Sequence, residues 1–102
     1  MQEPEELRKF LSSLDLPPTI GYRIDEPDTE ECSWFVDVVG RDPCDVFTTI
    51  SYQKDSGFQL WWNKCDDSYG TKPDYVTLDY REAREQVLLN VWAKLLACTR
   101  IY

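Results

Sequence analysis

The residues of this chain best suited to metal or redox chemistry are its four cysteines, Cys32, Cys44, Cys65 and Cys98. Successive cysteines leave 11, 20 and 32 residues between them, so the chain has no C-x-x-C pair of the kind that builds a zinc knuckle. Four thiols allow three disulfide pairings. Disulfides form in oxidising compartments, however, and we find no apolar leader sequence that would indicate one. We therefore expect reduced structural thiols, with neither a disulfide nor a bound metal.

Acid–base and nucleophilic chemistry are poorly supported, because the chain contains no histidine. Histidine is the usual general base near neutral pH and the most common metal ligand. Paired carboxylates would need a shaped cleft, and the four glycines form no phosphate-binding loop. We expect no catalytic residues, no cofactor and no enzymatic activity.

The other chemically distinctive residues are carboxylates in one short segment, Asp25, Glu26, Asp28, Glu30 and Glu31. Their spacing does not match the calcium-binding pattern D-x-[DN]-x-[DN]-G and is more typical of a solvated acidic loop. Residues 1–45 contain 12 acidic and four basic residues, so they carry the whole formal net charge of −8. We expect this segment to steer association with a basic protein partner.

The sign of the charge also restricts the classes of partner. An acidic surface repels phosphate backbones and anionic lipids, so we expect neither nucleic-acid binding nor membrane binding. A mimic of nucleic acid that blocks a DNA-binding protein is a weaker alternative, because its acids should follow one continuous face. The remaining interpretation is that the charge only keeps the protein soluble.

The elements that must position these residues fit one domain. The 102 residues are 42% apolar, which is enough to form a single core over residues 1–102. No run approaches the ~18 apolar residues of a membrane span. The N-terminus also lacks an apolar signal core, and together these features predict a cytoplasmic protein.

Two amphipathic segments predict helices at the two ends of the chain. Residues 4–14 place four apolar side chains at helical spacing, namely Leu7, Phe10, Leu11 and Leu14. Asp79 and Glu82 form a capping-box pattern at the start of a long C-terminal helix. The broad apolar face of that helix is formed by Tyr80, Ala83, Val87, Leu88, Val91, Leu95 and Cys98.

Four strands are predicted between the helices, at residues 20–24, 34–39, 46–52 and 58–62. Lys54–Gly57 is typical of a hairpin turn, and short connections favour an antiparallel meander. Residues 63–76 form a long connection, and residues 75–78 are an optional fifth strand. The predicted fold is an α+β domain with an N-terminal helix, a four-stranded antiparallel sheet and a long C-terminal helix, both helices packed on one sheet face.

Strand alternation places eight apolar side chains toward the helices, namely Trp34, Val36, Val38, Ile50, Tyr52, Phe58, Leu60 and Trp62. It leaves three aromatic side chains on the opposite sheet face, namely Phe35, Phe47 and Trp61. If that face is open to solvent, they form an interaction patch, because aromatic anchors dominate protein interfaces. The alternatives are that they only stabilise a solvated face, that the long connection covers them, or that the opposite face points inward.

A second apolar row on the C-terminal helix, Leu89, Trp92 and Leu96, projects away from the main face of that helix. Our first interpretation is that the N-terminal helix covers this row, since it brings a matching stripe to the same sheet face. The alternative is a homodimer contact, which would make the protein a structural or regulatory dimer.

In size, charge and element order the predicted domain resembles the small acidic immunity proteins that neutralise bacterial toxins, although no sequence motif supports the likeness. The resemblance implies an inhibitor that binds a basic partner. The function predicted from the sequence is therefore a non-catalytic protein-binding module of inhibitor or immunity type.

Overall fold

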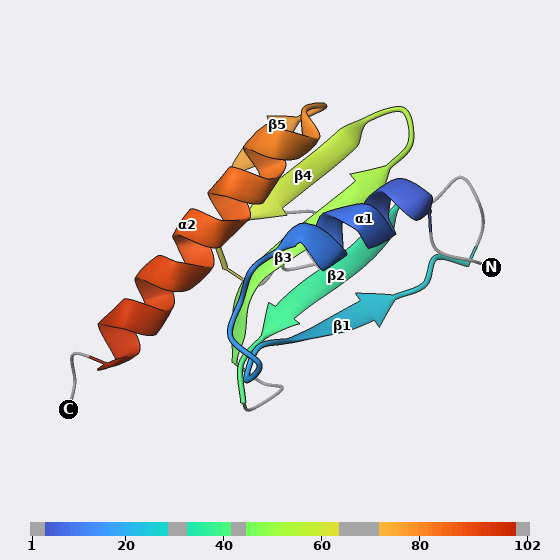
Figure 1. Ribbon diagram of the computed structural model, residues 1–102. Helices are drawn as coiled ribbons and strands as arrows, with labels where there is room; N and C mark the ends of the chain where they lie inside the picture. Colours follow the sequence, from blue (N-terminus) through green and yellow to red (C-terminus); the bar gives the residue numbers. More distant parts are fainter. Residues whose placement is uncertain (1–3, 29–32, 42–44, 64–71, 100–102) are drawn as a thin grey trace.

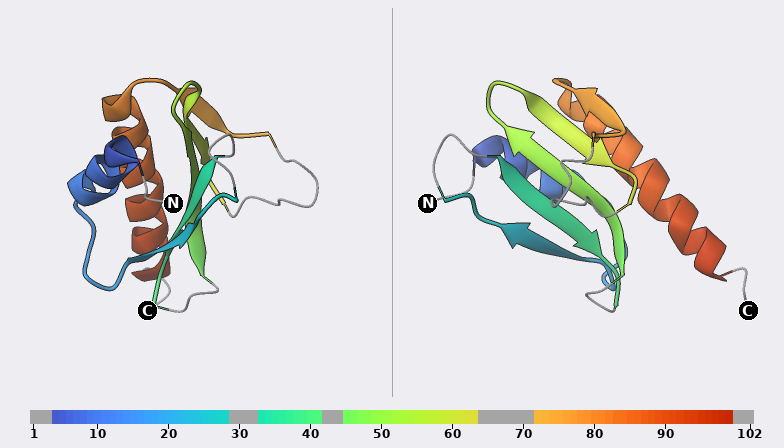
Figure 2. Two further views of the ribbon diagram at one scale, coloured as in Figure 1. Left: turned by 90° about the vertical axis from the view of Figure 1, so that its right-hand side faces the viewer. Right: turned by 180° about the vertical axis from the view of Figure 1, so that it is seen from behind.

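The computed structural model describes residues 4–28, 33–41, 45–63 and 72–99, and of Cys98 and Thr99 it describes only the backbone. The elements follow in the order α1 (Glu5–Ser13), β1 (Gly21–Asp25), β2 (Trp34–Val39), β3 (Val46–Gln53), β4 (Gly57–Trp61), β5 (Tyr75–Thr77) and α2 (Tyr80–Thr99). Both helices lie on the same face of the sheet (Figures 1 and 2). The predicted α+β architecture is confirmed.

The sheet is an antiparallel meander in the order β1-β2-β3-β4-β5. The predicted number of four strands was one too few. The end of the long connection pairs with the outer edge of β4, as in the register pair Phe58↔Thr77. As a result β1 and β5 are the two edges of the sheet.

The core lies between the sheet and the two helices. Leu7 and Phe10 of α1 are fully buried, and so are Ala83, Val87 and Val91 of α2. They pack on the strand side chains that were predicted to face the helices, Trp34, Val36, Val38, Ile50, Tyr52, Phe58 and Leu60. Trp62, predicted on the same face, packs half-buried at the margin of this core.

A glycine allows β5 to approach the β3–β4 hairpin. Gly57 has a φ of 75°, a left-handed conformation that favours glycine. A Cβ atom at this position would lie 2.7 Å from the carbonyl oxygen of Thr77. Any side chain here would therefore push β5 away from the hairpin.

α2 begins at the predicted N-cap. Asp79 Oδ1 accepts a hydrogen bond from the backbone N–H of Arg81 at 2.8 Å. Glu82 reaches the backbone of Asp79 indirectly, through Thr77. The hydroxyl of Thr77 accepts a hydrogen bond from the backbone N–H of Asp79 and donates one to Glu82 Oε2, both at 2.9 Å. This relay ties the first turn of α2 to β5 and sets the direction in which the helix leaves the sheet.

Candidate interaction surface

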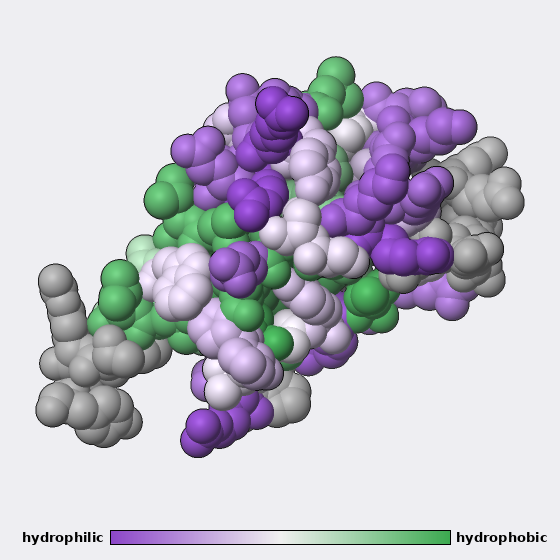
Figure 3. All heavy atoms as spheres, in the orientation of Figure 1, coloured by the Kyte–Doolittle hydropathy of each residue, from purple (hydrophilic) through white to green (hydrophobic). Residues whose placement is uncertain are grey.

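Three large apolar side chains lie exposed together on the outer side of α2. Leu89 is 59% exposed, Trp92 41% and Leu96 61%. Their spacing of three and four residues places them on one helix face, and we call these three residues the α2 strip. Apolar side chains gather along this flank of the molecule in Figure 3. The strip is a continuous apolar surface open to solvent.

The α2 strip lies in a part of the helix that carries almost no charge. Over residues 86–99 the only charged residue is Lys94, and its side chain turns toward the sheet. Lys94 Nζ donates to the carbonyl oxygens of Phe47 and Trp62, and to Asn63 Oδ1 at 3.1 Å. A helix segment that carries large apolar side chains on its outer side as well as on its core side is typical of a buried helix, not of a surface helix.

Polar side chains on the sheet side of α2 set its rotation. Asn90 Nδ2 donates to the carbonyl oxygens of Phe47 (3.2 Å) and Trp62 (3.0 Å), which also accept from Lys94. Partial burial lowers the pKa of Lys94 from its ordinary value, and the negative charge of Asp74 opposes that shift. Because Asn90 and Lys94 are held against the strand ends, the opposite side of the helix faces outward.

Our sequence reasoning overlooked Asn90 and Lys94. The signal was present, because they are two polar residues four positions apart inside an otherwise apolar segment. Such a pair marks a helix side that meets unpaired backbone carbonyls, since buried carbonyl groups need donors. Their role is to orient the α2 strip.

α2 is longer than the part of the sheet that it covers. Its 20 residues extend over about 30 Å at 1.5 Å per residue, whereas the adjacent strand β5 has three residues. Among the described side chains of α2, Val91 is the last that is buried. The final turns of the helix project past the sheet in Figures 1 and 2. The overhang leaves the last turns of α2 without support from the strands, and the α2 strip lies on the helix side that faces away from the sheet.

Our first interpretation, that α1 covers the α2 strip, was wrong. The stripe of α1 is used against the sheet, where the rings of Phe10 and Phe58 pack with their centroids 4.7 Å apart. α1 meets α2 near the start of α2, through a contact of Phe10 with Tyr80 and a 3.0 Å hydrogen bond from Arg84 Nε to the Ser13 carbonyl. The strip lies further along α2, beyond the end of the shorter helix.

Two shallow hollows flank Leu89. The larger, of about 620 Å³, is also lined by Tyr80, Arg81, Arg84, Glu85 and Leu88. The smaller, of about 360 Å³, is also lined by Trp62, Gln86 and Asn90. Leu89 therefore stands as a ridge between two recesses that side chains of another molecule can enter.

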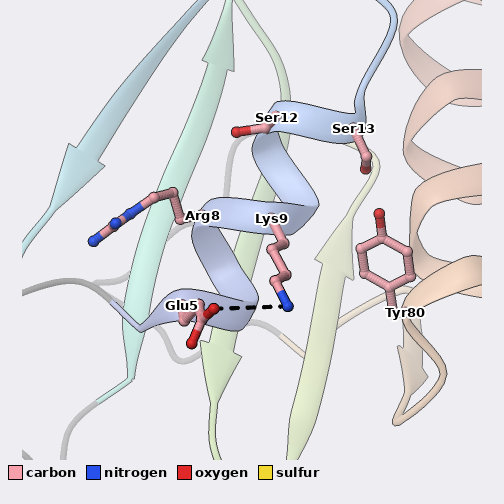
Figure 4. Close-up of a pocket in the computed structure, with 6 residues that line it drawn as sticks. All are labelled: Glu5, Arg8, Lys9, Ser12, Ser13 and Tyr80. Atoms are coloured by element: carbon pink, nitrogen blue, oxygen red, sulfur yellow. Dashed lines mark ion pairs between the residues drawn. The ribbon is translucent and has the colours of Figure 1, made fainter.

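The hollow between α1 and the start of α2 is lined by Glu5, Arg8, Lys9, Ser12, Ser13 and Tyr80 (Figure 4). Its volume is about 470 Å³. Lys9 pairs with Glu5 at 3.7 Å, and both side chains are largely exposed. The hydroxyl of Ser13 donates to the carbonyl oxygen of Phe10 at 2.7 Å. These contacts are typical of a solvated helix surface, where ion pairs contribute little.

The predicted aromatic patch on the other sheet face is not an open surface. Phe35 and Trp61 lie there with ring centroids 6.0 Å apart, but Trp61 is only 6% exposed and Phe35 is half-buried. Asp37 lies on the same sheet face, two residues along β2 from Phe35. It accepts hydrogen bonds from its neighbours on the adjacent strands, Arg23 (2.6 Å) and Thr49 (2.7 Å). The expectation that Trp61 is an exposed anchor was wrong, because this face is a packed network of polar and aromatic groups.

Phe47 does not share that face. The register of β2 and β3 shifts between Val38 and Val39, and Val39 pairs with Val46. Phe47 therefore has no partner in the ladder. A bulge of this kind redirects a side chain from the regular alternation. Phe47 consequently packs against the core under the helices, and its predicted position beside the other two aromatics was wrong.

The acidic segment is described only in part. Asp25 ends β1 and is exposed, as are Glu26 and Asp28, whereas Glu30 and Glu31 lie outside the described residues. Within the described ranges, no group of three or more Cys, Asp or Glu side chains is arranged to hold a metal ion. In the same ranges, no helix combines the length and apolarity needed to cross a membrane.

The predictions about the cysteines cannot be compared with the structure, because Cys32, Cys44 and Cys65 lie outside the described residues and the side chain of Cys98 is not described. No family model, no curated protein and no solved structure matches the chain. The interaction surface is therefore interpreted from its own geometry.

Proposed function

We propose that this protein is a non-catalytic protein-binding domain and that the α2 strip is its principal contact surface. The observation that carries this proposal is the joint exposure of Leu89, Trp92 and Leu96 on a segment whose opposite side already packs apolar residues against the sheet. Contiguous exposed apolar surface marks interaction sites. A tryptophan between two leucines also matches the aromatic anchors that dominate protein interfaces.

The structure around the strip supports a role in binding. Association that covers the strip removes its apolar surface from water, which is favourable. Trp92 lies at the centre of the strip, so its truncation is expected to cost about 2 kcal/mol or more of binding free energy. Asn90 and Lys94 hold the helix against the strand ends, which limits the conformational entropy lost on binding.

The proposal is tested by retention of a protein partner on the immobilised chain, with Trp92→Ser compared with Val76→Ser. Val76 is 56% exposed on β5, so the control removes apolar surface away from the strip. Wild type and Val76→Ser are expected to retain a partner from source-cell lysate, or an untagged second copy, and Trp92→Ser is expected to lose it. Equal retention by the three proteins, each with wild-type circular dichroism, would contradict the proposal.

A second candidate of the same class is an inhibitor or immunity-type protein that neutralises a basic partner. The exposure of Asp25, Glu26 and Asp28 at the end of the edge strand β1 favours it, because exposed charges raise the encounter rate with a partner of opposite sign. This candidate predicts a basic protein that is retained from lysate at low salt and released at high salt.

The variant for this second candidate is the triple substitution Asp25→Asn, Glu26→Gln and Asp28→Asn, with Asp15→Asn as the control for a single exposed charge. The triple variant is expected to lower the association rate with the retained basic protein, while the control leaves it near the wild-type value. An unchanged rate in the triple variant would remove the steering role of the segment.

A further inference from the structure

We infer that the partner of the α2 strip is a second copy of this chain, packed with the two copies of α2 antiparallel. This inference rests on the proposed function and names its partner. Its basis is the spacing of the strip, the recesses beside it and the distribution of charge along α2.

The spacing of the strip is self-complementary. Leu89 lies three residues before Trp92, and Leu96 lies four residues after it. A two-fold axis beside residues 92 and 93 therefore brings Leu89 of each copy against Leu96 of the other, with the two Trp92 side chains between these contacts. A symmetric dimer needs one surface that fits itself in this way. The two leucines are about 10 Å apart along the helix, which gives a contact of about two turns.

The surroundings of Leu89 suit this packing. In the antiparallel arrangement Leu96 of the second copy lies next to Leu89, beside the hollows of about 620 and 360 Å³. A leucine that enters such a recess packs as a knob in a hole. Because the last turns of α2 project past the sheet (Figure 1), the second helix can approach the strip without meeting the sheet.

Charge decides between the antiparallel and the parallel arrangement. The outer side of the first turns of α2 carries the exposed Glu85. In a parallel pair the two Glu85 side chains would face each other at a helix separation of about 8–10 Å. In the antiparallel pair they are about 22 Å apart along the helix, more than twice the Debye length of about 8 Å at physiological ionic strength. The antiparallel pair therefore avoids this like-charge repulsion.

Charge also favours a second copy over a basic partner at this surface. Each chain has a formal net charge of −8, and no acidic residue follows Glu85 in the sequence. Two acidic copies can meet at the α2 strip without bringing carboxylates together. A basic partner would find only Glu85 beside the strip, with Arg81 and Arg84 lining the same hollow. Salt screens the net repulsion between the copies and should strengthen their association. Salt would weaken binding to a basic protein.

Sedimentation velocity of the full chain over a concentration series tests the inference. A helix-pair contact of this size belongs among the small, transient interfaces, so wild type should change from monomer to dimer in the micromolar range, and at lower concentration when salt is added. Leu89→Glu and Leu96→Lys should each stay monomeric over that range. The control Leu78→Lys changes a residue that is 76% exposed just before α2, and it should dimerise like wild type.

Mixing the two variants tests the register. Equimolar Leu89→Glu and Leu96→Lys should form a mixed dimer, because the antiparallel pair sets the new carboxylate of one copy against the new ammonium of the other. A wild type that remains monomeric throughout would overturn the second copy as partner. If a lysate protein were still retained through Trp92, the proposed function would stand without this inference.

Two other outcomes also overturn the inference. Dimers formed by both single variants would place the contact outside the α2 strip. Monomeric variants with wild-type circular dichroism that do not associate on mixing would exclude the antiparallel register.

Discussion

In α1 the whole apolar stripe is covered, whereas in the second half of α2 three large apolar side chains face solvent. Leu7 and Phe10 are fully buried under α1, and the outer side of that helix carries charged residues. Beyond Val91, the described side chains of α2 are exposed or half-buried, and Lys94 is the only charged one among them. The apolar side chains of α1 are therefore buried within the monomer, whereas those on the outer side of the second half of α2 are not.

The two helices also differ in length relative to the sheet that supports them. α1 has nine residues, about 13 Å of helix, and lies wholly over the sheet. α2 has 20 residues and continues past the strands. An apolar helix side that neither the sheet nor α1 covers can bury its surface only against another molecule, so the α2 strip marks the contact region.

The largest expected effect on the free energy of unfolding comes from the packing of α1 on the sheet. Phe10→Ala removes a fully buried ring that packs on Phe58, and it should lower the free energy of unfolding by about 3–5 kcal/mol. Trp92→Ala, measured at a concentration where the chain is monomeric, should lower it by clearly less, about 1 kcal/mol, because Trp92 is 41% exposed. Urea denaturation followed by circular dichroism measures both. Similar losses in the two variants would mean that the second half of α2 is as well covered as α1.

A smaller effect concerns the contacts that orient α2. Lys94→Met removes the donor to the carbonyl oxygens of Phe47 and Trp62 and leaves Asn90 as their donor. It should lower the free energy of unfolding by about 1–2 kcal/mol. Lys72→Met, at an exposed lysine before β5, is the matched control and should have almost no effect. Equal urea midpoints for the two variants would show that Lys94 does not hold the helix.

The smallest expected effect on the free energy of unfolding comes from the hydrogen bond that attaches α1 to the sheet. The hydroxyl of Tyr52 donates to Glu6 of α1. Burial, followed by this hydrogen bond and the negative charge of Glu6, raises the pKa of Tyr52 from 10.0 to about 12. Tyr52→Phe should lower the free energy of unfolding at neutral pH by about 1 kcal/mol.

The raised pKa of Tyr52 also predicts a pH dependence. Between pH 10 and 12 the unfolded chain loses the tyrosine proton while the folded chain keeps it, so the contribution of Tyr52 to stability is complete below pH 10 and is lost as the pH rises to 12. Tyr52→Phe should therefore lose less stability than wild type over this range. Urea denaturation at several pH values measures the difference, and parallel profiles for the two proteins would contradict the assignment.

Much of the fold could be predicted from local patterns. The apolar spacing in α1, the Asp79 N-cap of α2 and the alternation that turns Val36 and Ile50 toward the helices all agree with the structure. Each of these features depends on residues close together in the sequence, where period and capping chemistry act directly. The Leu89–Trp92–Leu96 row was also visible in the sequence, but whether it was covered was not.

The sequence by itself determined which residues form the two helices and four of the five strands, and which side of each helix carries the apolar groups. Only the tertiary structure decided that Phe47 turns into the core at a bulge, that Trp61 is buried and that α1 ends before the α2 strip. The physical reason is that strand register and helix position depend on contacts between residues far apart in the chain. These contacts are settled by packing of the whole domain, and no local period encodes them.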